Sequence, residues 1–173
     1  MKNISLLLVV GLVSVAIAQV PPPKPEELKK LTFLVGKFEG TQKIIVDPTQ
    51  PPLDAKGSVD SKWILDGRHL SWGFKGDFID MKMEGVLTLT YDPAIKTFIG
   101  TWIDNLGQAV LVMKGNFEGL KLILTSDEIE AEGMGKVTMR ATYWGTDKGF
   151  NFDLDMKSGD QWGPVMRTEF KKK

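Results

Sequence analysis

The chain has 173 residues, no cysteine, a single histidine and a formal net charge of zero. This length is sufficient for one domain with a substantial core. The lack of cysteine excludes thiol nucleophiles, thiolate metal sites and disulfides, and one histidine excludes multi-histidine metal sites. The balanced charge argues against nucleic acid as a partner, because no basic field is present to bind phosphates.

The N-terminus has the features of a secretory signal peptide. Lys2 is a short positive region, the stretch from Ile4 to Val15 is largely apolar, and Ala16-Ile17-Ala18 has the small-x-small pattern of a cleavage site. We therefore expect cleavage after Ala18 and a secreted or periplasmic mature chain. The apolar stretch is too short for a mature membrane span, and no later run is long enough to cross a bilayer. The alternative is a retained N-terminal anchor.

Residues 19–35 are expected to form a Pro-rich leader followed by a short helix. Val20 to Pro25 favours an extended conformation, and Pro25 suits the first turn of a helix. The acidic pair that follows is favourable at the positive end of the helix dipole. A helix is predicted over Glu26–Leu34, with an apolar face that covers one end of the following domain. That face is formed by Leu28, Leu31 and Leu34.

From Gly36 onward, apolar and polar residues alternate in short runs separated by turn-forming residues. A period of two places one set on each face of a strand. Gly73 and Gly76 suggest a bend or bulge in the third strand, which is expected to resume over Phe78–Met83. The other expected strands are Phe38–Asp47, Ser58–Leu65, Arg68–Phe74, Val86–Tyr91, Phe98–Ile103, Ala109–Phe117, Leu120–Thr125, Val137–Trp144, Phe150–Met156 and Val165–Phe170.

About ten sequential strands with short turns predict an all-β, antiparallel up-and-down barrel over residues 36–173. The lack of long helices between strands excludes parallel crossovers, and closure of the sheet removes its edges. The acidic segment after the seventh strand matches no calcium-binding loop and is predicted to be solvated. It contains Asp127, Glu128, Glu130 and Glu132.

Several motifs, taken together and in this order, resemble the bacterial secreted family called domain of unknown function 1579. The resemblance covers nearly the whole mature chain and implies no established activity. Its motifs are the run Glu26–Gly40, Trp63-Ile64-Leu65-Asp66-Gly67-Arg68, Glu84-Gly85 with Thr90-Tyr91-Asp92, and Gly100-Thr101-Trp102-Ile103-Asp104.

The segment Gly36-x-Phe38-x-Gly40 resembles the opening of lipocalin-like (calycin) barrels, in which Trp usually stands at the Phe38 position. The resemblance implies an aromatic residue that closes one end, with an arginine of the last strand, here Arg167, packed across it. The related nitrobindin-like barrels hold haem through a histidine late in the chain. Because no histidine follows His69, the resemblance implies no haem, and no other cofactor is expected.

No residues at catalytic or metal-binding spacing stand on this scaffold. His69 alternates with Leu70 and Trp72 and is expected to point outward, without a partner that would make it a base. Asp153 and Asp155 share one strand face with polar residues, which predicts a solvated outer face rather than an acid/base pair.

The candidate ligand-binding residues are the large side chains predicted to face inward, together with Arg167. Arg167 lies on a strand without clean alternation, so it could anchor an anionic head group inside, stack on Phe38 or pair with Glu169. The set is Trp63, Trp72, Phe74, Trp102, Met113, Tyr143, Phe152 and Arg167.

Three functions remain open at this point. A barrel of this size can hold one small ligand, which favours binding of a small hydrophobic or amphipathic molecule in its interior. The interior can instead be filled by side chains, which would make the barrel a protein-interaction or structural module. The third function is a cavity-based isomerase or hydrolase whose catalytic residues the sequence does not identify. Ligand identity and oligomeric state are not determined by the sequence.

Overall fold

The computed structural model of the protein describes residues 21–107, 109–131 and 133–173. The predicted signal peptide, its cleavage site and Glu132 lie outside the described residues. The described part contains one short helix, η1 (Glu26–Leu34), and a sheet of 11 strands. The strands are β1 (Gly36–Ile44), β2 (Leu53–Ile64), β3 (His69–Phe78), β4 (Met81–Asp92), β5 (Thr97–Asp104), β6 (Leu111–Glu118), β7 (Lys121–Ser126), β8 (Ile129–Ala131), β9 (Gly135–Thr146), β10 (Gly149–Ser158) and β11 (Gln161–Lys172).

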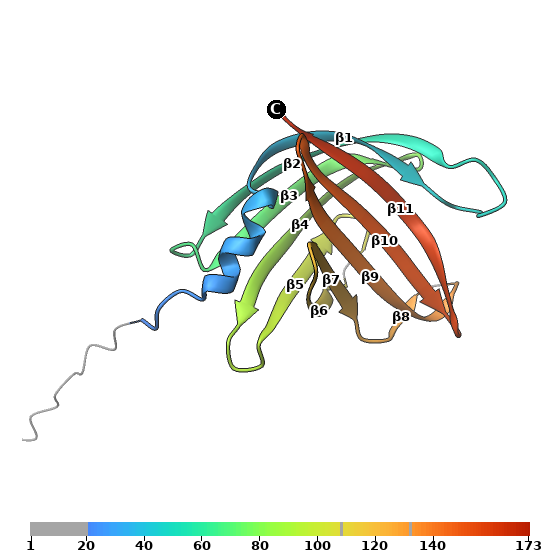
Figure 1. The fold of residues 1–173 in the computed structure, drawn as a ribbon. Coiled ribbons are helices and arrows are strands. Elements are labelled where there is room, and N and C mark those ends of the chain that lie inside the picture. The colour runs from blue at the N-terminus through green and yellow to red at the C-terminus, as the bar shows by residue number, and fades with distance from the viewer. Residues whose placement is uncertain (1–20, 108, 132) are drawn as a thin grey trace, which may run out of the picture.

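All the strands except β8 close into one antiparallel barrel (Figure 1). β1 to β7 pair in chain order, and β7 pairs with β9. The pairings of β9 with β10, β10 with β11 and β11 with β1 complete the ring. β8 is attached to β9 as an extra strand beside the ring. The predicted all-β up-and-down barrel is therefore confirmed, and closure protects the main-chain groups that an open sheet would expose at its edges.

Helix η1 covers one end of the barrel, as predicted, and packs against β4, β9 and β10 (Figure 1). It is a 3₁₀ helix. Because such a helix has three residues per turn, side chains spaced three apart lie on the same face. Leu28, Leu31 and Leu34 have this spacing, and all three are buried. The spacing of the leucines thus explains the face that the helix turns toward the barrel.

The two ends of the barrel differ, and we name them by their relation to η1. The closed end is the end that η1 covers, and the open end is the opposite one. The connections at the open end are residues 45–52, 79–80, 105–110, 127–134 and 159–160. Phe38, Phe98, Phe150 and Phe170 are among the largest fully buried side chains of the main core. A second, smaller cluster contains Ile44, Ala55 and Met166, from the strand segments near the open end.

Three local expectations are wrong. Phe78 ends β3 and Met81 begins β4, so residues 78–83 contain a tight turn with a positive φ at Ile79 and not a resumed strand. The third strand has no register shift, and the only shift among the described pairings lies between Leu154 and Asp155. The acidic segment after β7 is not all loop, because it includes β8.

Among residues 21–107, 109–131 and 133–173, no helix combines the length and the apolar character needed to cross a bilayer.

Candidate ligand-binding site

Trp72 occupies the middle of the barrel interior. Alternation along β3 turns Leu70, Trp72 and Phe74 inward, and all three are buried. The Trp72 ring centroid lies 6.1–6.4 Å from six other aromatic rings. Most of these pairs are tilted or edge-to-face, which is favourable beyond the burial of apolar area. The rings form a packed cluster around Trp72, and they belong to Phe74, Trp102, Tyr143, Phe150, Phe152 and Phe170.

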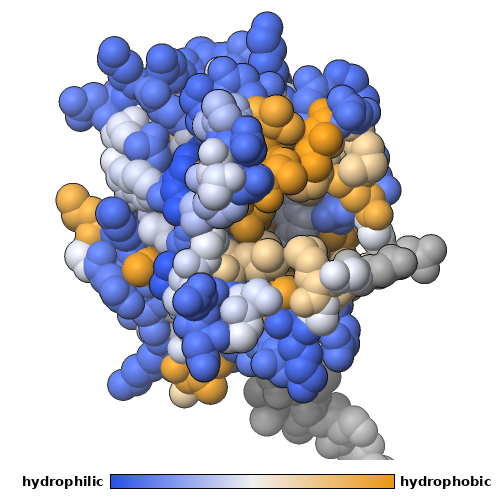
Figure 2. Space-filling view, turned by 90° about the vertical axis from the view of Figure 1, so that its right-hand side faces the viewer, coloured by the Kyte–Doolittle hydropathy of each residue, from blue (hydrophilic) through white to orange (hydrophobic). Residues whose placement is uncertain are grey.

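Some of the inward side chains nearer the open end are only partly buried. Several of them pack against the core on one side and keep part of their surface exposed, unlike Trp72, Phe150 and Phe170, which are buried. Figure 2 views this end of the barrel and shows apolar side chains gathered around a recess. We call this region the open-end recess, and we assign to its apolar wall the partly buried inward side chains of the strand segments nearest this end: Met83, Trp102, Leu111, Phe152 and Leu154. Partly exposed apolar side chains beside a packed core provide a surface on which a small ligand could be buried.

Glycines on neighbouring strands make room for the large rings. A Cβ atom at Gly85 of β4 would lie 2.3 Å from ring atoms of Trp102. In the same way, a Cβ atom would lie 2.8 Å from the Phe74 ring at Gly57 and 2.6 Å at Gly76. The absence of side chains at these positions therefore sets where the two rings lie. This role also explains Gly76, one of the two glycines of β3 that suggested a bend in the sequence.

Trp102 is oriented by a carboxylate at the open end. Its indole N–H donates a hydrogen bond to Oδ2 of Asp104, at 2.6 Å. The other carboxylate oxygen accepts hydrogen bonds from the backbone N–H groups of Leu106 and Gly107, at 2.9 and 3.2 Å. Trp102 and Asp104 are two residues apart on β5 and so share its inward face. A half-buried carboxylate therefore adjoins the apolar wall of the recess.

The interior also contains polar side chains that the sequence analysis missed. Gln42, Ser61 and Thr168 occupy inward positions and are buried. Gln42 donates a hydrogen bond to the backbone carbonyl of Asp77, at 3.4 Å. The Ser61 and Thr168 hydroxyls and Nε1 of Trp72 have no hydrogen-bond partner among the described residues. The sequence indicates such residues where a polar residue stands on the strand face whose other residues are apolar, as Thr168 does between Met166 and Phe170.

The structure brings most of the predicted site residues together. Trp72, Phe74, Trp102, Tyr143 and Phe152 form one aromatic cluster, and Trp63 and Met113 belong to the same core. Of this set, only Trp102 and Phe152 contribute to the wall of the open-end recess. The others are buried or, like Trp63 near the end of β2, belong to the closed end.

Arg167 does not belong to the interior, so the expectation that it could point inward is wrong. Its neighbours Met166 and Thr168 are the buried, inward residues of β11. Arg167 instead pairs on the outer face with Asp155 at 2.5 Å and Asp153 at 3.4 Å. It therefore neither stacks on Phe38 nor closes the barrel. The Phe38 ring packs edge-to-face on Phe150, with centroids 4.9 Å apart.

Asp153 and Asp155 lie on the outer face, as predicted, but they are less solvated than expected. Asp155 is held between two arginines, because Arg140 also donates to it at 3.0 Å. Burial raises the pKa of Asp153, and the adjacent Asp155 carboxylate raises it further, while the Arg167 guanidinium opposes both effects. Each carboxylate has a cationic partner, so this arrangement is an ion-pair network and not an acid/base pair.

Tyr143 makes the stability of the barrel sensitive to alkaline pH. Burial raises the pKa of its phenol above the ordinary value of 10.0. In the unfolded chain the phenol ionises near that ordinary value, so above it unfolding releases a proton. The stabilising contribution is therefore complete below about pH 10 and declines as the pH rises above it. Above about pH 10, Tyr143 should lower the free energy of unfolding of the wild type by about 1.4 kcal/mol for each pH unit. Tyr143→Phe should remove this contribution, because phenylalanine has no group that ionises.

The measurement is urea unfolding of both proteins at neutral pH and at several pH values above 10. The slopes are compared rather than the absolute stabilities, because the substitution also changes packing. Identical slopes for wild type and Tyr143→Phe would contradict the role of burial.

His69 lies on the outer face of β3, as predicted, because Leu70 and Trp72 point inward. Within the described part of the chain, no three His, Cys, Asp or Glu side chains gather closely enough to hold a metal ion. We expect His69→Ala to change the free energy of unfolding by no more than about 0.5 kcal/mol, as at other surface positions. Chemical denaturation measures this difference, and a loss above about 1 kcal/mol would show a structural role for the imidazole.

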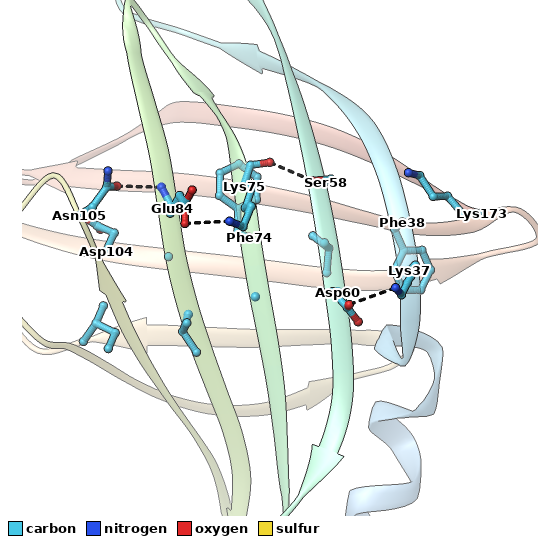
Figure 3. A pocket seen from close by; sticks show the side chains of 15 residues that line it. Lys37, Phe38, Ser58, Asp60, Phe74, Lys75, Glu84, Asp104, Asn105 and Lys173 are labelled. Atoms are coloured by element: carbon cyan, nitrogen blue, oxygen red, sulfur yellow. Dashed lines mark hydrogen bonds and ion pairs between the residues drawn. The ribbon is translucent and has the colours of Figure 1, made fainter.

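A groove of about 560 Å³ also crosses the outside of β1 to β5 (Figure 3). Four of its charged side chains form pairs, Lys37 with Asp60 at 3.5 Å and Lys75 with Glu84 at 3.0 Å. Gly73 lies between these pairs and contributes no side chain to the groove. Surface ion pairs satisfied in this way leave little unmet polarity for a ligand, so the open-end recess is the better candidate.

Comparisons with known proteins agree with this architecture. The chain is similar to the crystal structure of Rv2717c from M. tuberculosis, with a TM-score of 0.62 and 13% sequence identity. The match covers 87% of this chain and 99% of that one, and at this identity it shows a shared fold alone. No curated protein sequence matches the chain significantly. The family model described as "Protein of unknown function (DUF1579)" matches residues 24–172, and the chain therefore belongs to this family.

Proposed function

We propose that this barrel binds a small hydrophobic or amphipathic molecule in the open-end recess. The observation that carries the proposal is the partial exposure of apolar side chains that point into the barrel. A guest that covers Trp102, Leu111 and Phe152 would remove apolar surface from water, at about 25 cal/mol per Å². The packed cluster around Trp72 would limit how deep the guest reaches, so an acyl chain or a flat ring system would suit the recess.

Titration with N-phenyl-1-naphthylamine, a neutral fluorescent probe of apolar sites, tests this proposal. We expect probe fluorescence to rise with saturation and the melting temperature to increase with probe concentration, by linkage. Trp102→Ala should weaken both effects, because it removes part of the wall. Trp144→Ala is the matched control, since Trp144 lies on the outer face of β9 and should leave probe binding unchanged.

The alternative is a filled barrel that acts as a protein-interaction or structural module. It would be favoured if neither the probe nor a panel of fatty alcohols and isoprenoids changed the melting temperature. Trp102→Ala would then only destabilise the fold. Such a result would overturn the binding proposal.

We also propose that the mature protein begins at Gln19 and acts outside the cytoplasm, with residues 36–173 as its barrel domain. The A-x-A pattern at Ala16-Ile17-Ala18 supports this. Intact-mass analysis of the exported protein would show the loss of residues 1–18, and their retention would indicate an N-terminal anchor instead.

A further inference from the structure

We infer that the open-end recess selects an amphiphile with a cationic head group and discriminates against carboxylates and other anions. This inference rests on the proposed function and names the chemical class of its ligand.

The connections at the open end carry acidic residues and no basic ones. The connections at the closed end are mixed, because Asp66 and Asp147 are accompanied by Arg68, Lys96 and Lys148. The barrel therefore has an acidic opening even though the whole chain is neutral. The described acidic residues of the open-end connections and β8, which we call the acidic rim, are Asp47, Asp80, Asp127, Glu128, Glu130 and Asp160.

Lysines on the adjoining strands neutralise only part of the acidic rim. Lys136 pairs with Glu128 at 2.9 Å, and Lys157 approaches Asp160 at 3.8 Å. Lys82 pairs with Asp77 of β3 and not with the rim. Within the described residues, the acidic side chains of the rim that form no ion pair are Asp47, Asp80, Asp127 and Glu130.

Asp104 brings a further carboxylate to the wall of the recess itself. It accepts the Trp102 indole N–H at 2.6 Å, so carboxylate and ring are fixed side by side. An alkyl chain that lies along Trp102 would place its head group next to Asp104. A cation at this position would gain from the carboxylate and from the face of the indole, the best of the aromatic rings for cation–π attraction. An anion at this position would be repelled by the carboxylate and by the negative face of the indole ring.

The test compares three amphiphiles with the same decyl chain: decyltrimethylammonium, decyl glucoside and decanoate, each below its micelle concentration. Displacement of N-phenyl-1-naphthylamine reports binding. At low ionic strength we expect decyltrimethylammonium to bind at least about tenfold more tightly than decanoate, with the glucoside between them. Added salt should narrow this gap, because screening shortens the reach of the rim charges, and should leave the glucoside unaffected.

Two double variants localise the effect. Asp80→Asn with Asp127→Asn removes exposed charges of the acidic rim and should reduce the preference for the cation severalfold. Asp66→Asn with Asp147→Asn removes the same number of charges at the closed end and should leave the preference unchanged.

The outcomes separate the inference from the proposed function. If decanoate binds as tightly as the ammonium compound, or if the two double variants behave alike, the inference is overturned while the binding function stands. If none of the amphiphiles displaces the probe, or the probe itself fails to bind, both are overturned.

Discussion

Trp72→Ala is expected to lower the free energy of unfolding by about 3–5 kcal/mol, the range for loss of a large buried aromatic side chain. Trp72 is 3% exposed and contacts rings from several strands of the barrel. These strands include β3, β5, β9, β10 and β11. Its removal would leave a cavity that the surrounding rings cannot fill without leaving their positions, because closed pairing holds the strands in place.

Trp162→Ala is the matched control for this substitution. Trp162 is 39% exposed and stacks over the Arg140 guanidinium on the outer face, with the guanidinium carbon 4.1 Å from the ring centroid. We expect this variant to lose no more than about 1 kcal/mol, the size of an exposed cation–π contact. Equilibrium denaturation measures both. Equal losses would show that Trp72 is not the centre of the core.

Gly85→Ala should destabilise the barrel by about 1–3 kcal/mol and move the Trp102 ring, because overpacking forces neighbours from their preferred positions. The added Cβ would lie 2.3 Å from two atoms of that ring. Trp102 is also held by Asp104, so the ring cannot move away from Gly85 without disturbing the hydrogen bond at 2.6 Å. The variant should therefore also weaken probe binding in the open-end recess.

Gly73→Ala provides the control, because Gly73 lies on the neighbouring strand but on the outer face. A Cβ atom there would meet only the Asp60 carbonyl oxygen, at 3.6 Å, an ordinary contact. We expect its stability to stay within about 0.5 kcal/mol of wild type. Urea denaturation and tryptophan fluorescence follow both variants. If Gly85→Ala and Gly73→Ala matched in both measurements, Gly85 would not position Trp102.

The acidic rim and the apolar recess together make the binding proposal more specific than a cavity alone. Apolar burial would supply most of the affinity, whereas the charges would decide which head groups are accepted. Arg167, a plausible anchor for anions from its sequence position, lies on the outer face and pairs with Asp155.

The sequence by itself determined the architecture, because alternation with a period of two and short turns leave few options other than an antiparallel barrel. It also determined helix η1, through leucines spaced three apart, and the inward direction of Trp72, Trp102 and Phe152. These are local properties, set by backbone geometry and by which face of each strand is apolar.

Only the tertiary structure decided which inward residues are packed and which line a recess. Trp63 and Trp102 both fall on the inward face of their strands, but η1 covers one end of the barrel and the described chain has no second helix over the other. The same holds for Gly85, whose role depends on a ring of the adjacent strand, and for the acidic rim, whose members come from separate connections. Such features depend on strand register and closure, which bring together residues that are distant in the chain.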